Sequence, residues 1–172
     1  GYRVGLQNGG SWYTAHRRQL AAALAPLQPR ARVVCALGAA GRLPPARYAA
    51  ELRDTRLVVS PFGWGEITDR DFHAINAGCL LVKPDMSHLM TEPQVYRAGR
   101  SYVPVRWDGA DLADTCARWL ADPAAAAELA RAAASTYRAW LLRGGFLGRL
   151  GTILERLGVA AAPRRCGPAS RW

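Results

Sequence analysis

The sequence has almost no lysine and few of the patterns that hold metal ions. Lys83 is its single lysine, and the other basic residues are arginines, which together with abundant alanine indicates a GC-rich coding bias. The 3 histidines form no HExxH pattern, and the 4 cysteines form no CxxC pair. The sequence therefore carries no signal for a zinc site or a disulfide scaffold, and we expect no metal. Cys35 and Cys79 lie within apolar runs, and we expect them to be buried in a reducing, cytoplasmic setting.

Long hydrophobic runs and a signal sequence are also missing. No run of about eighteen apolar residues occurs, which is the length that a membrane-spanning helix needs. The opening residues, GYRVGLQNGG, include no starting methionine and no basic-then-apolar pattern, so we expect them to come from the middle of a longer protein. Of the 172 residues 50% are hydrophobic and 21% are charged, a composition typical of a globular chain with the length of one domain.

Negative charge is scarce, since 13 acidic residues accompany 23 basic ones and the formal net charge is +10. A nucleic-acid-binding surface gathers its basic residues on one face. Here the arginines are scattered, apart from Arg17–Arg18 and the tail PRRCGPASRW, so we expect no nucleic-acid partner. The alternative is a solvated basic surface that favours acidic ligands or anionic lipid headgroups, with peripheral membrane association as the result.

Apolar segments that suit strands alternate with helical patterns along the chain. The expected strands span 2–10, 31–41, 56–65, 79–85 and 101–108, and the expected helices span 13–27, 44–55, 68–78, 111–123 and 124–158, the last interrupted at Gly144–Gly145. This alternation predicts right-handed βαβ units. The fold class is therefore α/β: a single Rossmann-like domain over 1–159, with a parallel sheet covered by helices on both faces. We expect 160–172 to form a loose tail.

Local signals mark the ends of several elements. Thr68 and Asp71 have the spacing of a capping box, and Gly78 is placed to end the helix that they begin. Asp111 is expected to cap the helix that follows it. Pro104 lacks a backbone N–H, which predicts an irregular strand or one at the edge of the sheet.

The segment SPFGWGEITDRDFHAINAGCLLVKPD, residues 60–85, joins two expected strands through a glycine turn and a helix start. Ligands of parallel sheets bind at such junctions, beyond the carboxyl ends of the strands. Gly63 and Gly65 would let a phosphate approach the backbone, and Arg70 could fork onto a diphosphate beside the helix N-terminus. Thr68 would cap that helix. The alternative is that the glycines only form tight turns and that Arg70 is a surface residue.

Other residues could complete this anion site. Gly9 and Gly10, followed by His16, Arg17 and Arg18, could form a cationic cradle at the neighbouring strand end.

Three further side chains are candidates for contacts with a sugar or a phosphate. His73 lies three residues after Arg70 and could bond a ribose hydroxyl, or it could be a satisfied, partly buried histidine. Glu66 could orient a sugar hydroxyl or only favour the helix start. Lys83, followed by Asp85, ends the second strand at the ligand edge and could contact phosphate or sugar; a lone lysine is also often a surface residue. His88 is a weaker candidate.

Residues 60–108 resemble the donor-binding, C-terminal domain of GT-B glycosyltransferases, and among these the bacterial exostosin-like and spore-coat-type members. The stretches that carry the resemblance are SPFGWGE, RDFHAINAGCLLVKPDMSHL and SYVPVRWD, supported by the helical segment LADPAAAAELARAAASTYRAWL. The resemblance implies transfer of a sugar from a nucleoside-diphosphate sugar to a glycan, lipid or protein hydroxyl. It implies no metal, and a separate N-terminal domain that binds the acceptor.

The sequence departs from this family pattern in two ways. Where many relatives have a ribose-binding glutamate it has His73, and a second family glutamate would fall on Gly65, next to Glu66. The length also suffices for only one of the two GT-B domains. These departures favour, as the alternative function, a non-catalytic binding or interaction module that has kept the fold.

Overall fold

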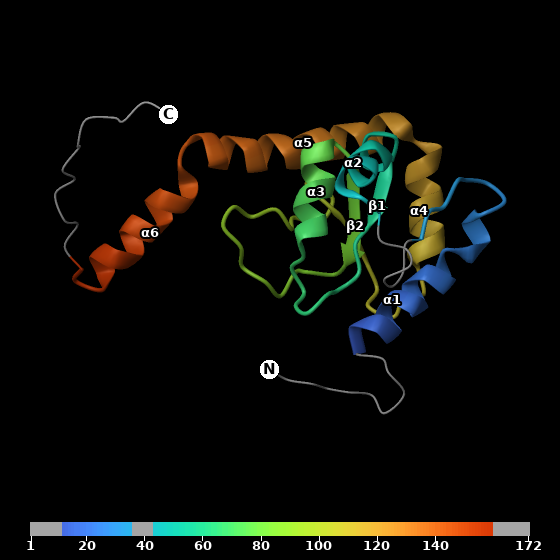
Figure 1. Ribbon diagram of the computed structural model, residues 1–172, viewed down its shortest axis with the longest axis horizontal. Helices are drawn as coiled ribbons and strands as arrows, with labels where there is room; N and C mark the ends of the chain where they lie inside the picture. Colours follow the sequence, from blue (N-terminus) through green and yellow to red (C-terminus); the bar gives the residue numbers. More distant parts are fainter. Residues whose placement is uncertain (1–11, 36–42, 160–172) are drawn as a thin grey trace. The chain divides into compact units, whose positions relative to one another are not determined.

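The computed structural model describes residues 12–35 and 43–159 (Figure 1). Its first part holds α1 (Trp12–Ala23), the short 3₁₀ helix η1 (Ala25–Leu27) and α2 (Pro45–Arg53). The βαβ region follows, with β1 (Leu57–Val59), α3 (Asp69–Ala77), β2 (Leu80–Pro84) and β3 (Val103–Val105). The chain then continues through α4 (Leu112–Ala121), α5 (Pro123–Leu142) and α6 (Gly145–Arg156).

The three strands form a parallel sheet in the order β1-β2-β3. Leu57 pairs with Leu80 and Val82 pairs with Val103, so β2 is the central strand, and all five of its residues are buried. Such a strand must be apolar on both faces, as the run CLLVKPD predicts. Pro104 lies in β3, at the edge of the described sheet, where a missing N–H is tolerated.

Apolar side chains cover both faces of the sheet, because successive residues of a strand point to opposite sides. Leu80 and Val82 belong to one core cluster, together with residues of α1, η1, α4 and α5. Leu81 belongs to the other, with Ala74 and Ile75 of α3 and the tyrosines that precede β3. The predicted α/β, Rossmann-like fold with helices on both faces is confirmed, and Figure 1 shows α3 on one side of the strands and α4 on the other.

One predicted strand differs from the structure. The described part of the 31–41 prediction, residues 31–35, forms no strand, and Val34 and Cys35 are exposed. Val33 packs against the core cluster that contains Leu20 of α1, so apolar contacts cover only one side of the segment. The expected burial of Cys35 is therefore wrong, whereas Cys79 is buried as expected. The strand predicted at 2–10 lies outside the described residues.

The helix-end predictions have mixed outcomes. Thr68 and Asp71 form the expected capping box at α3, and Gly78 ends this helix in the left-handed conformation with φ of 74°. Asp111 occupies the N-cap position of α4, but its side chain makes no capping bond. Its Oδ1 instead accepts the backbone N–H of Arg106 at 2.8 Å, so it fastens the loop after β3.

The described residues from 138 onward belong to a second compact unit. Gly144, with φ of 64°, separates α5 from α6, as the glycine pair predicts. The apolar side chains of α6 are exposed: Phe146, Leu147, Leu150, Ile153 and Leu154. Among the described residues, no helix combines the length and the apolar character that a membrane crossing requires.

Two glycines with left-handed backbones provide a matched test of the packing between α1 and the loop after β3. A Cβ on Gly109 would lie 2.5 Å from Cδ2 of the buried Leu20, whereas a Cβ on Gly99 would meet nothing within 4 Å. Gly99→Ala should lower the free energy of unfolding by about 1 kcal/mol through backbone strain alone. Gly109→Ala should lower it by about 2–4 kcal/mol, because overpacking adds to the strain. Urea unfolding of both variants measures the difference, and equal losses would contradict the close packing of Leu20.

Candidate functional site

The loops that follow β1, β2 and β3 meet at the carboxyl edge of the sheet, and α1 lies against two of them. Arg17 Nε donates to the carbonyl oxygen of Phe62, after β1, at 3.0 Å. His16 Nε2 lies 3.1 Å from the carbonyl oxygen of Trp107, after β3. Trp107 in turn donates its indole N–H to the carbonyl oxygen of Asp85, after β2, at 2.9 Å. The three loops and α1 therefore form one connected site.

The glycine turn after β1 has one glycine that packing requires and one that faces open space. Gly63 donates its N–H to the carbonyl oxygen of Gly65 at 3.0 Å. A Cβ on Gly63 would lie 3.1 Å from Cγ2 of Thr68, closer than most side chains tolerate, and 3.4 Å from Nη2 of Arg17, an ordinary contact distance. A Cβ on Gly65 would meet nothing within 4 Å. The close packing of Thr68 against this turn therefore depends on Gly63.

A buried carboxylate lies directly beneath the turn. Asp71 is fully buried and accepts hydrogen bonds from the Ser60 hydroxyl, the Thr68 hydroxyl and the Tyr96 hydroxyl, the last at 2.6 Å. It also accepts the Thr68 backbone N–H at 3.1 Å and the Lys83 ammonium at 3.2 Å. These bonds connect the end of β1, the first turn of α3, β2 and the segment before β3.

Lys83 lies beneath the site and not on its surface. Its side chain is fully buried, forms an ion pair with Asp71 and donates to the carbonyl oxygen of Ser60 at 3.4 Å. Its ammonium also lies 5.4 Å from the centroid of the Phe62 ring. Burial lowers the pKa of Lys83, and the charge of Asp71 partly opposes that change. The residue predicted to contact a phosphate or sugar is thus placed where it fixes the floor of the site.

Arg70 carries one of the two side-chain polar atoms that are buried without a hydrogen-bond partner in the described part of the chain. It is half-buried in the first turn of α3, and its Nη1 is buried without a hydrogen-bond partner. The charge of Arg70 also contributes to the lowered pKa of Lys83. Leaving a buried donor unpaired costs about 1–3 kcal/mol, and more for a charged group. An anion at this position would remove that cost.

His73 and Glu66 differ in their surroundings. His73 is exposed, so it is not the partly buried histidine of the alternative interpretation, and its ring lies 5.6 Å from that of Tyr48 on α2. Glu66 is partly exposed, and its Oε1 lies 3.0 Å from Nε2 of His88. The structure therefore brings Arg17 and Thr68 to the turn, with Glu66 directly after it, Arg70 in the first turn of α3 and Lys83 buried below. Gly9 and Gly10 lie outside the described residues.

Sequence reasoning missed an aromatic hollow at this edge. It measures about 290 Å³ and is lined by Trp12, His16, Phe62, Glu66 and Trp107. The Phe62 ring lies 5.0 Å from that of His16, 5.2 Å from that of Trp107 and 6.3 Å from that of Trp12. One signal was present in the sequence: Phe62 lies three residues after the end of β1, Trp107 lies two residues after the end of β3, and Trp12 begins α1.

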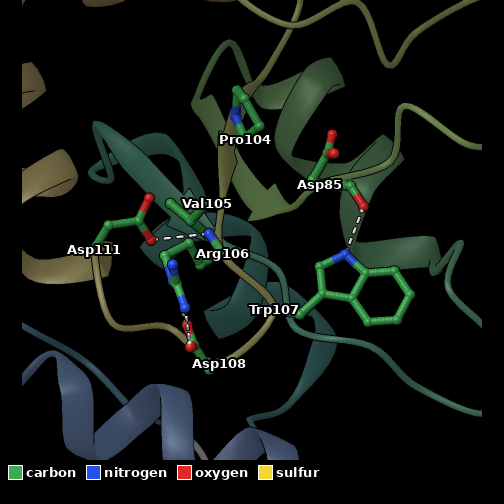
Figure 2. Close-up of a pocket in the computed structure, with 7 residues that line it drawn as sticks. All are labelled: Asp85, Pro104, Val105, Arg106, Trp107, Asp108 and Asp111. Carbon is green, nitrogen blue, oxygen red and sulfur yellow. Dashed lines mark hydrogen bonds and ion pairs between the residues drawn. The ribbon is translucent and has the colours of Figure 1, made fainter.

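A larger hollow, of about 670 Å³, lies beside the loop after β3 (Figure 2). Its lining residues are Asp85, Pro104, Val105, Arg106, Trp107, Asp108 and Asp111. Arg106 forks onto Asp108 at 3.0 and 2.6 Å and lowers the pKa of that carboxyl to about 2. The three carboxylates of this hollow, of Asp85, Asp108 and Asp111, each accept a hydrogen bond from another group of the chain. Over residues 12–35 and 43–159, no group of three acidic, histidine or cysteine side chains is placed to hold a metal ion.

A family model described as "Glycosyl transferase-like" matches residues 16–142, which include the three strands, the glycine turn and α3. The chain belongs to the glycosyl transferase-like family. No curated protein and no solved structure matches it. In this glycosyl transferase-like chain, the buried Asp71 is therefore part of the matched region, together with the turn above it.

The ion pair between Lys83 and Asp71 should be needed for stability of this glycosyl transferase-like domain. Lys83→Met keeps the length of the side chain but leaves the Asp71 charge buried without its counter-ion. We expect the free energy of unfolding to fall by about 3–5 kcal/mol, the usual cost of breaking a buried pair. The double variant Lys83→Met with Asp71→Asn should recover part of this loss. Urea denaturation measures both, and a loss below about 1 kcal/mol for the single variant would contradict the argument.

Proposed function

We propose that this glycosyl transferase-like domain binds the nucleoside-diphosphate-sugar donor of a glycosyl transfer reaction at the carboxyl edge of its sheet. The observation that carries the proposal is the buried, unpartnered Nη1 of Arg70 in the first turn of α3. A diphosphate offers oxygen atoms that could accept the hydrogen bond for which this guanidinium has no partner. Hydrogen bonds between charged groups are stronger than those between neutral groups. Arg17, whose Nε donates to the carbonyl oxygen of Phe62 just before this turn, adds positive charge.

The arginine side chains contribute more to the proposed binding of a diphosphate than the first backbone N–H groups of α3 do. The backbone N–H of Thr68 already donates to Asp71, and that of Arg70 donates to Asp69 Oδ1 at 2.8 Å. The dipole of α3 still favours an anion at its N-terminus. Because the Asp71 charge is taken up by Lys83, it does not cancel the attraction of Arg70 for a phosphate.

The proposed chemistry follows from these charges. When the glycosidic bond of the donor breaks, negative charge grows on the departing diphosphate, and positive groups already in place stabilise it without a metal. The acceptor, a hydroxyl of a glycan, a lipid or a protein, must be held against the anomeric carbon, and its proton needs a base. We assign those two tasks to a separate acceptor-binding domain of the GT-B type.

A second candidate function is a non-catalytic binding module with the same ligand. The observation that favours it is that His73 is exposed, at the place where the resemblance to GT-B enzymes implies a ribose-binding glutamate. Both functions predict binding of a nucleoside diphosphate by this chain. They differ in whether sugar transfer appears once an acceptor-binding domain is present.

The first test concerns Arg70. In isothermal titration calorimetry with UDP, GDP, ADP and TDP, we expect one of them to bind with a Kd of about 0.1–1 mM. Arg70→Ala should weaken that binding by about 1.5–3 kcal/mol, the scale of a charge-assisted hydrogen bond. The matched control is Arg100→Ala, an exposed arginine just before β3 and thus at the opposite edge of the sheet. The absence of binding by all four nucleotides, or equal effects of the two substitutions, would sink the proposal.

The second test concerns His73. A carboxylate accepts two charge-assisted bonds from ribose hydroxyls, whereas a neutral imidazole offers one acceptor. His73→Glu should therefore tighten nucleoside-diphosphate binding several-fold. Because His73 is exposed, the substitution buries no charge and should leave the melting temperature nearly unchanged. His73→Gln is the control for shape, and equal affinities of the Glu and Gln variants would remove this position from the ribose site.

A further inference from the structure

The aromatic hollow has the size and the walls of a site for a single ring. Its volume of about 290 Å³ lies near the lower end of the range for small-ligand sites. Trp12 and Trp107, which line it, are 45% and 51% exposed, a large amount for side chains of this size. Apolar faces left open to water around a concave surface indicate a place where a ligand binds.

The tautomer of His16 can be deduced from its partner. Its Nε2 lies 3.1 Å from the carbonyl oxygen of Trp107, and a carbonyl oxygen only accepts, so Nε2 carries the proton. Burial, the largest influence, lowers the pKa of His16, which favours the neutral ring. Nδ1 is then a lone-pair acceptor, and it is buried without a partner. On this wall of the hollow, His16 Nδ1 is therefore a hydrogen-bond acceptor that has no donor partner.

Glu66 provides the second polar group of the hollow, and it is also an acceptor. Its Oε1 bonds His88, and the side chain remains 36% exposed, so the carboxylate can accept further bonds. A group that enters the hollow must therefore bring hydrogen-bond donors within an apolar frame. A phosphate brings none and would be repelled by Glu66, which assigns it to the Arg70 side of the turn.

We propose that the hollow binds a pyranose ring, with its C–H face on Trp12 and Trp107 and its hydroxyls donating to Glu66 and to His16 Nδ1. The inference rests on the proposed function, since the sugar lies one glycine turn away from the diphosphate site. Nδ1 is covered in the ligand-free chain, so the second bond requires the imidazole or a covering side chain to move.

A planar nucleobase fits the same walls less well. Phe62 and Trp107 meet at an interplanar angle of 82°, and Phe62 is already stacked on His16 at 23°. A flat base is held best between parallel faces, whereas a puckered ring presents C–H groups in several directions. The walls thus favour the sugar.

The sugar has two chemical sources, the glycosyl group of the donor and a terminal sugar of the acceptor. Calorimetry on the whole 172-residue chain separates them with four kinds of ligand: inorganic pyrophosphate, the nucleoside diphosphates UDP and GDP, their conjugates UDP-glucose and GDP-mannose, and the free methyl glycosides of glucose and mannose. A donor sugar in the hollow makes the conjugate bind more tightly than its diphosphate. An acceptor sugar makes a methyl glycoside bind by itself. Both outcomes support the site.

The decisive variants are Trp12→Ala and Glu66→Gln. Each should reduce the affinity for the sugar-bearing ligand about tenfold, the scale of one stacked ring or one charge-assisted bond, and leave pyrophosphate unaffected. The control is Trp64→Ala, which removes an exposed tryptophan of the same turn that does not line the hollow. Circular dichroism and the melting temperature show that each variant is folded.

Two results would overturn the inference. One is an equal loss for the diphosphate and its sugar conjugate in Trp12→Ala, which would place the base in the hollow. The other is an unchanged affinity of every sugar-bearing ligand in both variants. Failure of pyrophosphate and of both diphosphates to bind counts instead against the proposed function, and the methyl glycosides then test the hollow by themselves.

Discussion

The site depends on one buried carboxylate. Asp71 accepts five hydrogen bonds from groups up to 25 residues away from it in the sequence, and one of its donors is the only lysine of the chain. A charge without solvent is tolerated only when its partners are complete, so these bonds form together or not at all. The network fixes the start of α3 against the ends of β1 and β2, and thereby holds Arg70 beside the glycine turn.

Above this network, α1 fixes the loops through backbone carbonyl groups. Arg17 and His16 contact the carbonyl oxygens of Phe62 and Trp107, so the loops are held by atoms that every residue possesses. The side chains of Phe62 and Trp107 are then left to form the aromatic hollow. The buried Asp71 network beneath the turn stabilises this edge of the sheet. The exposed rings above the turn form a surface suited to ligands.

Local signals predicted much of this fold. The cap of α3, its end at Gly78, the buried β2 and the edge position of Pro104 each follow from a few neighbouring residues. The strand expected at 31–41 did not form over 31–35, because strands need a partner and the sequence does not say where one lies. The turn and Arg70 could be found from residue types. The burial of Lys83 and the hollow could not, since Trp12, Phe62 and Trp107 meet only through the fold.

The burial of Lys83 also determines how the protein reacts with reagents that modify amines. Acylating reagents and lysine-specific cross-linkers attack an accessible ε-amino group, and the only one in this sequence is enclosed by Asp71, Ser60 and Phe62. Burial lowers the pKa of Lys83 while the charge of Asp71 partly opposes that change, and the fold denies the reagent access to the amine. The rate at which Lys83 is acylated therefore reports how often this part of the protein opens.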